Sequence, residues 1–520
     1  MASRYTLTSL AGLILCLFWM VAPALTAPFV LSDDWDILQT CGADHRADLW
    51  EMTLPFRKYQ LSPDIARFFP GTWVLKGLEI GLFGDAPLAY HSLRMATGAA
   101  TVTLIFLACH PWLGSALAAW IGLAFIGGPQ AICWMRLGYS ETWSMLFVAA
   151  ALWSLSRAAR SQREACPPAA LLLLSLTGWI KETFIPLLPL LHAVLGVRRS
   201  SWAYLTPSWR WAWLACCLQV AGLAWELLHD PAQYGGTSLA GFRRGLGHWI
   251  LNYRLTGFDE WLIFAGCLAY LALRPEQREG ARRWLPVVAF LVASQLLISA
   301  AMFGDLVPRI QVHDGQGRYL FPGLLAPLGA MFAVLALIRH ASIAGMPQRQ
   351  LRLRLATGLA ALALLHRVGP QLAFQRSVAH YYTEAACTFD EALDEVDVWR
   401  DQHPNNPVVL LGSALDEEGF LSLATFLHTR RPGIKQPWMQ VGPARGQAAW
   451  APLRVRKQKE EWLQGFVRAG WNRPTGTPGI QPWPPPRPLS ECLLLVLPRT
   501  APSPKYLQGW HHVIQLPDGY

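Results

Sequence analysis

Two adjacent carboxylates, Asp33 and Asp34, follow the first apolar stretch of the chain. That stretch covers about residues 7–30 and is long enough to cross a bilayer. The pair is therefore expected at a membrane surface, near the start of a polar loop over residues 31–86. A carboxylate there can remove the proton from an attacking hydroxyl group, and a second one lets one group stay ionised while the other is tuned. The alternative is structural, with Ser32 or Asp33 capping a helix that begins near Trp35.

Lys181 interrupts the apolar stretch 167–197, and an isolated ammonium inside a bilayer is costly. If this stretch is one helix, Lys181 needs a buried acidic partner, for which Glu141 and Glu182 are the candidates. If it is two short helices, Lys181 reaches the outer surface, where it can meet a phosphate. An ion pair between helices and a phosphate site are both open at this point.

A second cationic position, Arg318, begins a late apolar run. Its guanidinium either anchors a helix at the interface or binds a phosphate through two hydrogen bonds. The preceding loop, residues 304–317, is rich in glycine and contains Arg309 and His313. Such a loop could close over a bound headgroup.

The composition explains what must hold these side chains in place. The chain is 53% hydrophobic and 15% charged, whereas about 25% is usual for soluble proteins. Apolar runs recur through the first 370 residues and predict an all-α polytopic membrane bundle of about eleven transmembrane helices. The predicted spans lie near residues 8–30, 88–109, 112–133, 142–156, 167–180, 183–197, 210–228, 259–273, 285–302, 319–338 and 351–370.

The arginines between these runs predict the orientation. They fall in alternate short loops, which is typical of cytoplasmic loops and places the N-terminus in the cytoplasm. The net charge of +10 therefore indicates membrane anchoring, and no nucleic acid partner is expected. A cleaved secretory signal over residues 1–28 is the alternative interpretation of the first run.

The tail differs from the rest in composition. Residues 371–520 contain many prolines and charged residues, and two short apolar runs, residues 407–412 and 492–497, read as buried strands. With helical patterns near residues 388–402, 417–429 and 458–468, they predict a soluble α/β domain. The division is thus a membrane domain over residues 1–370 and an α/β domain over residues 371–520. Cys387 and Cys492 could form a disulfide if this domain lies outside the cytoplasm.

Cofactor signatures are weak. No glycine-rich phosphate loop or dinucleotide fingerprint is present. Asp44, His45 and Asp48 form a loose cluster without diagnostic metal spacing. We assign no metal site and leave a divalent cation open.

The chain resembles the C-class membrane glycosyltransferases, which include protein mannosyltransferases and lipid A aminoarabinose transferases. The match extends over about residues 5–370 and keeps the family's order of elements. The matching residues are Asp33 and Asp34, Arg67, Pro70, Leu82-Phe83-Gly84, Pro87, His91, Glu141, Gly178 with Lys181, and Arg318-Tyr319 with Pro322. Two phenylalanines separate Arg67 from Pro70, so this part of the pattern is loose.

The resemblance implies transfer of a sugar from a polyprenyl-phosphate-linked donor to a lipid or glycan acceptor, with inversion, on the periplasmic side of a bacterial inner membrane. Asp33 or Asp34 would be the base. The donor phosphate would be bound by Arg318, Lys181 and Arg309, and substrate would be positioned by Glu141, Arg67 and His313.

Two other classes remain open. A polytopic transporter or flippase would not need two carboxylates in a long outer loop, and it usually shows inverted repeats, which are not evident here. A polysaccharide polymerase or ligase acting on lipid-linked glycans would carry its long outer loop late in the chain.

Overall fold

A computed structural model describes the helical core and most of the strands of the tail. The described residues are 2–30, 34–41, 46–53, 69–138, 140–161, 167–181, 184–185, 187, 207–229, 243, 347–412, 417–430, 437–441, 485, 487–498 and 502–516. The predicted spans near residues 259–273, 285–302 and 319–338, most of the span near residues 183–197, and the helix predicted near residues 458–468 lie outside these ranges.

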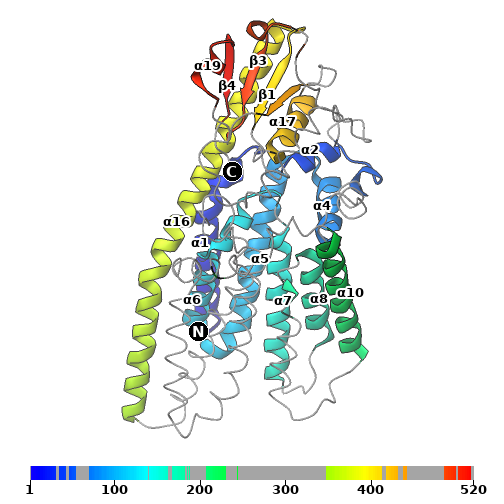
Figure 1. Ribbon diagram of the computed structural model, residues 1–520. Coiled ribbons are helices and arrows are strands. Elements are labelled where there is room, and N and C mark those ends of the chain that lie inside the picture. Colours follow the sequence, from blue (N-terminus) through cyan, green and yellow to red (C-terminus); the bar gives the residue numbers. More distant parts are fainter. Residues whose placement is uncertain are drawn as a thin grey trace.

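The described part of the first 230 residues is helical (Figure 1). Its α-helices are α1 (Ala2–Val21), α2 (Trp35–Cys41), α4 (Pro70–Phe83), α5 (Pro87–Leu113), α6 (Ser115–Ile126), α7 (Glu141–Arg160), α8 (Pro168–Ile180) and α10 (Pro207–His229). Three 3-10 turns lie between them: η1 (Ala22–Thr26), η3 (Glu51–Thr53) and η4 (Pro129–Trp134).

Proline and glycine determine where these helices begin and end. Helices α4, α5, α8 and α10 each begin at a proline, whose fixed φ suits the first helical position. Gly84 ends α4 and Gly114 ends α5, with φ of 57° and 80°, a region that favours glycine. Gly114 alone separates α5 from α6, and the two helices pack against each other.

The up-and-down order brings distant segments together. In Figure 1 the end of α1, the start of α5, the start of α7 and the end of α8 lie at the same end of the bundle, beside the sheet domain. We call this the polar end, because the buried charged side chains described below gather there.

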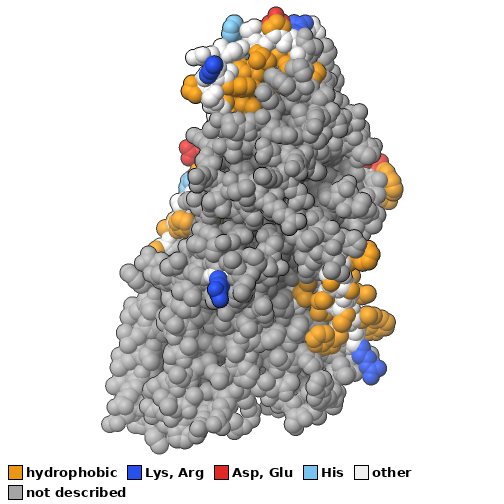
Figure 2. Space-filling view, in the orientation of Figure 1, with side chains coloured by type: hydrophobic (Ala, Val, Ile, Leu, Met, Phe, Trp, Pro, Cys, Tyr) orange, Lys and Arg blue, Asp and Glu red, His pale blue; other side chains and the backbone are white. Residues whose placement is uncertain are grey.

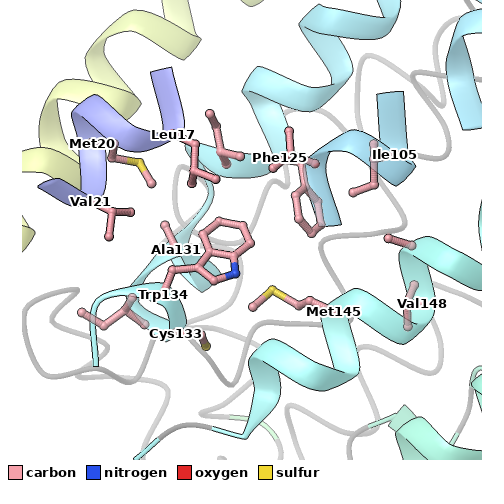
Figure 3. Packing of buried hydrophobic residues seen from close by; sticks show 14 of the residues in the cluster. Leu17, Met20, Val21, Ile105, Phe125, Ala131, Cys133, Trp134, Met145 and Val148 are labelled. Carbon is pink, nitrogen blue, oxygen red and sulfur yellow. The ribbon is translucent and has the colours of Figure 1, made fainter. Parts of the chain in front are cut away.

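The bundle has an apolar core. Its largest fully buried side chains include Trp134 and Phe125, whose ring centroids lie 5.9 Å apart. Figure 3 shows Trp134 among Leu17, Phe125 and Met145, so the short turn η4 fills the space between α1, α6 and α7. The predicted single span near residues 112–133 is therefore wrong. Helix α6 ends at Ile126, before Gly127, Gly128 and Pro129, and η4 follows.

Two of the described helices are long and apolar enough to cross a membrane, Arg4–Thr26 and Pro87–Leu113. Ser115–Ile126 and Pro168–Ile180 are apolar but shorter. Helix α10 turns large apolar side chains outward, among them Trp211, Leu214, Leu218 and Trp225, and Figure 2 shows them as an apolar patch. An outward apolar face of this kind is typical of contact with lipid or a partner.

Helix α16 (Pro347–Gln402) joins the bundle to the tail. Its 56 residues make it on the order of 80 Å long, with Pro370 in its interior. The predicted span near residues 351–370 and the predicted helix near residues 388–402 are parts of this one helix, and the predicted division at residue 370 falls within it. The sequence suggested two elements because its apolar run changes there to an amphipathic pattern.

The tail forms a parallel sheet of four described strands, in the order β2-β1-β3-β4. They are β1 (Val408–Gly412), β2 (Trp438–Val441), β3 (Leu493–Val496) and β4 (His512–Gln515). Leu410 pairs with Met439 on one side and with Leu495 on the other. The two predicted buried strands are β1 and β3, which are buried along their whole length as expected for a parallel sheet.

Helices cover this sheet. The end of α16 and helix α17 (Glu417–Arg430) supply Phe389, Leu393 and Phe426 to the core on one face. The short helix α19 (Pro504–Leu507), the turn η9 (Leu489–Glu491) and Trp510 pack on the other. Cys387 is exposed, Cys492 is buried, and both are free thiols, so the disulfide considered from the sequence is not formed.

Candidate functional site

Buried charged side chains are concentrated at the polar end of the bundle. Each of them is less than 9% exposed: Asp34, Lys76, Glu79, Arg94, Arg136, Glu141 and Lys181. Burying a charge is costly unless it is paired or put to use. The helix ends that meet here therefore form the candidate site.

Asp34 lies at the junction between η1 and α2 and is 1% exposed. Its Oδ2 accepts a hydrogen bond of 3.0 Å from the backbone N–H of Val30, and its own carbonyl accepts one of 3.0 Å from Ile37 N–H. The chain thus turns tightly around this carboxylate and enters α2 at Trp35, where the sequence predicted a helix start. Asp33 and Ser32 lie outside the described residues.

The first turn of α5 lies beside this junction. Tyr90 lies in one apolar cluster with Ile37 and Cys41 of α2, and its hydroxyl donates to the Gly84 carbonyl at 2.8 Å. His91 Nε2 lies 3.1 Å from the Ala27 carbonyl oxygen. Because a carbonyl oxygen only accepts, His91 must donate from Nε2, and this bond ties the turn after α1 to α5.

A buried ion pair joins α4 to α5. The two terminal nitrogens of Arg94 reach the two carboxylate oxygens of Glu79 at 2.7 and 2.5 Å. Arg94 also donates to the hydroxyl of Thr142 at 3.3 Å and to the carbonyl of Leu137 at 2.8 Å. Trp143 Nε1 donates to Glu79 at 2.5 Å. The network fixes α4 and α5 against the start of α7, with the bidentate geometry that gives such pairs their specificity.

Lys181 and Glu141 form a second buried pair. Their Nζ and Oε1 atoms are 3.3 Å apart, and the side chains are 9% and 5% exposed. Lys181 follows directly after α8 in extended backbone, with φ of −150° and ψ of 129°. Both alternatives drawn from the sequence thus hold in part: a helix ends at Ile180, and Lys181 pairs with Glu141. Glu182 lies outside the described residues.

An aromatic stack lies beneath this pair. Lys181 Nζ is 5.4 Å from the centroid of the Phe69 ring, and Phe69 stacks on Trp73 with centroids 5.6 Å apart. A second ammonium, that of Lys76, is 5.5 Å from the Trp73 centroid. Helix α4 and the residue just before it thus carry two aromatic rings, each with a buried lysine over it, and the face of an aromatic ring attracts such a cation.

The start of α4 fits tightly against the end of α8. A Cβ on Gly71 would lie 2.9 Å from the Trp179 carbonyl oxygen, so only glycine allows this approach. Thr72 donates to the Ile180 carbonyl, and its hydroxyl lies 2.9 Å from that of Ser140, at the start of α7. Helix α4 is therefore held between the Asp34 junction on one side and the Lys181–Glu141 pair on the other.

Several predicted site residues cannot be placed: Asp33, Arg67, Arg309, His313 and Arg318 lie outside the described residues. Of the others, Glu141 and Lys181 come together, and Asp34 lies at the same end of the bundle. Lys76, Glu79 and Arg94 were not among the site residues predicted from the sequence. One signal was available, since Arg94 is the only arginine, lysine or acid in the predicted span 88–109, where a lone charge is costly.

No metal centre is evident in the part of the chain that the structure describes, where no three His, Cys, Asp or Glu side chains are grouped to hold an ion. Asp48, from the loose cluster noted in the sequence, accepts hydrogen bonds from the backbone of Trp50 and Glu51 at 2.8 and 2.7 Å. It caps the turn η3. Asp44 and His45 lie outside the described residues.

Chemically, the polar end combines a buried carboxylate with buried ammonium groups near the ends of apolar helices. A carboxylate can accept a proton, and an ammonium can stabilise an anionic leaving group. Such a pairing suits group transfer with an anionic leaving group.

No family model matches the chain, and no curated protein matches it. Among solved structures, it is similar to the crystal structure of ArnT from Cupriavidus metallidurans bound to undecaprenyl phosphate, with 14% identity and a TM-score of 0.42 over 90% of this chain and 92% of that one. The apo structure of the same protein gives 14% identity and a TM-score of 0.43, over 90% and 91% of the two chains.

Proposed function

We propose that this chain is a membrane glycosyltransferase that moves a sugar from a polyprenyl-phosphate-linked donor to a lipid or glycan acceptor. The observation that carries the proposal is the burial of Asp34 and of the Lys181–Glu141 pair at one end of the bundle. The sequence pattern supports the same reaction, because the acidic pair, the LFG segment, Glu141 and Lys181 follow one another in the order of the C-class glycosyltransferases.

The proposed reaction is a single displacement. The acceptor oxygen attacks the anomeric carbon, a new carbon–oxygen bond forms, and the bond from that carbon to the phosphate oxygen breaks with inversion. The electron pair leaves with the polyprenyl phosphate. The acceptor's proton passes to Asp33 or Asp34 acting as general base, a role that contributes typically about 10²–10⁴-fold in rate.

Lys181 is proposed to stabilise the leaving phosphate, whose negative charge grows in the transition state. Its ammonium lies against Glu141 and over the Phe69 ring, which orients it. A lipid phosphate would join or replace the carboxylate as its partner, so Glu141 serves as a positioning residue. From the sequence pattern alone, Arg318 and Arg309 share the phosphate, and Arg67 and His313 position substrate.

The proposed location is a bacterial inner membrane. The arginine pattern supports an orientation with the N-terminus in the cytoplasm and with the polar end and the α/β domain on the periplasmic side. The membrane domain is proposed over residues 1–370 and the periplasmic domain over residues 371–520, joined through α16.

The test is a transfer assay. Purified protein is incubated with radiolabelled undecaprenyl-phosphate sugars and a membrane lipid extract, and the labelled product is identified. We expect label to move to a lipid or glycan product with release of undecaprenyl phosphate. Accumulation of unmodified donor inside sealed vesicles, without covalent transfer, would contradict the proposal and favour a transporter or flippase.

A further inference from the structure

Helix α2, which begins directly after Asp34, is buried on two sides. Ile37 and Cys41, one turn apart, belong to an apolar cluster with Ile80, Tyr90 and Leu137 of the bundle. The neighbouring residue Leu38, 5% exposed, belongs instead to the core of the α/β domain. That core also contains Phe389, Leu393, Leu423, Phe426, Leu427 and residues of β1, β3 and β4.

The chain just before Asp34 is shared in the same way. Phe29 packs against both the domain core and the cluster of Ile37 and Cys41. Val30 lies in the bundle core and donates its N–H to the Asp34 carboxylate. Asp34 is therefore held between two anchors, Phe29-Val30 and α2, and each of them contacts the α/β domain.

Helix α17 is the part of the domain that lies along α2 (Figure 1). Helix α2 has 7 residues, and helices this short are not stable by themselves in water. Its position must therefore come from packing, and it loses its packing against the domain core if Leu38 no longer fits there.

We infer that the α/β domain positions the acidic junction for the transfer step, and that Leu38 is the positioning residue through which it acts. This inference rests on the proposed function. It assigns the domain to the catalytic unit, because the domain fixes the backbone from which Asp34 projects. A misplacement of about 1 Å at a reacting group can cost about 10²-fold in rate.

The inference predicts which kinetic parameter changes. Lys181 and Glu141 are held by the ends of α8 and α7, so donor binding should survive when α2 is loosened. We expect Leu38→Ala to lower kcat by about 10- to 100-fold, with KM for the undecaprenyl-phosphate sugar within about 2-fold of wild type. Leu38→Met, which conserves volume, should restore most of kcat.

A matched control exists in the same domain. Val398 lies on α16 with 57% of its surface exposed, so Val398→Ala should leave kcat and KM unchanged. If Leu38→Ala is not recovered as folded protein, the smaller change Leu38→Val can be used instead, with a smaller fall in kcat expected. A rise in KM with kcat unchanged, or equal effects of Leu38→Ala and Val398→Ala, would overturn the inference.

A second measurement does not depend on transfer activity. Hydrogen exchange followed by mass spectrometry reports the protection of residues 29–41 in Leu423→Ala, a change on α17. We expect faster exchange in residues 29–41 than in the wild-type protein. Unchanged exchange there would overturn the inference even if transfer is confirmed. Faster exchange in a protein whose wild type transfers no sugar would overturn the proposed function and leave the mechanical link between α17 and α2 in place.

Discussion

The polar end of the bundle and the α/β domain differ in how deeply their paired charged side chains are buried. At the polar end, Arg94 and Glu79 form an ion pair with side chains 2% and 7% exposed. In the α/β domain, Arg430 of α17 is 25% exposed and pairs with Asp390, Asp394 and Asp397 of α16, whose side chains are 44%, 70% and 19% exposed. Exposed pairs contribute about 0–1 kcal/mol, whereas breaking a buried pair typically costs about 3–5 kcal/mol.

This difference identifies the region in which the chain bears the free-energy cost of burying charged side chains. The domain obtains its stability from apolar strands such as β1 and β3, which are buried throughout. The polar end holds carboxylates and ammonium groups out of water, although apolar residues of similar volume would often be as stable. Such an arrangement is expected where charges are needed for binding or catalysis.

The largest expected effect is on turnover. Asp34→Asn and Asp33→Asn each remove a candidate base, and for the residue that acts as the base kcat should fall about 10²–10⁴-fold with expression retained. Asp394→Asn, on the exposed face of α16, is the control and should leave turnover unchanged. The measurement is transfer of labelled sugar by purified protein. Normal turnover in both Asp33→Asn and Asp34→Asn would exclude this pair as the base.

The next effect is on stability. Arg94→Met leaves the Glu79 carboxylate buried without its main partner and should lower the free energy of unfolding by about 3–5 kcal/mol. Arg430→Met, in the other region, should cost about 0–1 kcal/mol. Thermal unfolding in detergent compares the two variants. Equal losses in both would remove the contrast between the regions.

A smaller effect is expected at Lys181, the lysine proposed to bind the donor phosphate. Lys181→Met should raise KM for the donor and lower kcat, together about 10- to 100-fold in kcat/KM, because an ionised donor to phosphate is lost. Lys181→Arg keeps the positive charge and should recover part of the lost kcat/KM. Steady-state kinetics with undecaprenyl-phosphate sugar as the varied substrate test this. A variant Lys181→Met with wild-type kcat/KM would assign Lys181 to structure only.

The smallest expected effect is a difference in reactivity between two cysteine thiols of the tail, Cys387 and Cys492. Burial, with a smaller contribution from Glu491, raises the pKa of the Cys492 thiol, so it is protonated near neutral pH, while Cys387 is exposed. The thiolate is the reactive form. At pH 7 maleimide should therefore modify Cys387 and spare Cys492 until the protein is unfolded, as measured on tryptic peptides. Prompt reaction of Cys492 in folded protein would show that β3 is not packed as described.

The sequence predicted helices well where a proline marks the start of the helix. Proline begins α5 and α8, and both lie close to the spans expected near residues 88–109 and 167–180. It failed at α16, because the apolar run changes near residue 370 to an amphipathic pattern while the helix itself continues. Hydropathy reports whether a segment is buried, and it does not report whether a helix continues into a different environment.

The site was less accessible to sequence reasoning. Lys181 and Glu141 were noticed because a lone lysine in an apolar stretch demands a partner. The pairing of Glu79 with Arg94 depends on how α4 is rotated against α5, and no periodicity within either helix encodes that rotation. The contact of Leu38 with the α/β domain joins segments more than 300 residues apart and could be seen only in the folded structure.

The central claim is that the acidic pair and the polar end face the exterior. A single cysteine, Ser32→Cys, can be probed in intact cells with a maleimide that does not cross membranes, with peptides resolved by mass spectrometry. The matched control is Ser161→Cys, which follows α7 at the opposite end of the bundle. We predict that Ser32→Cys is labelled from outside and that Ser161→Cys is labelled only after the membrane is opened. Labelling of Ser32→Cys from the cytoplasmic side alone would contradict the account.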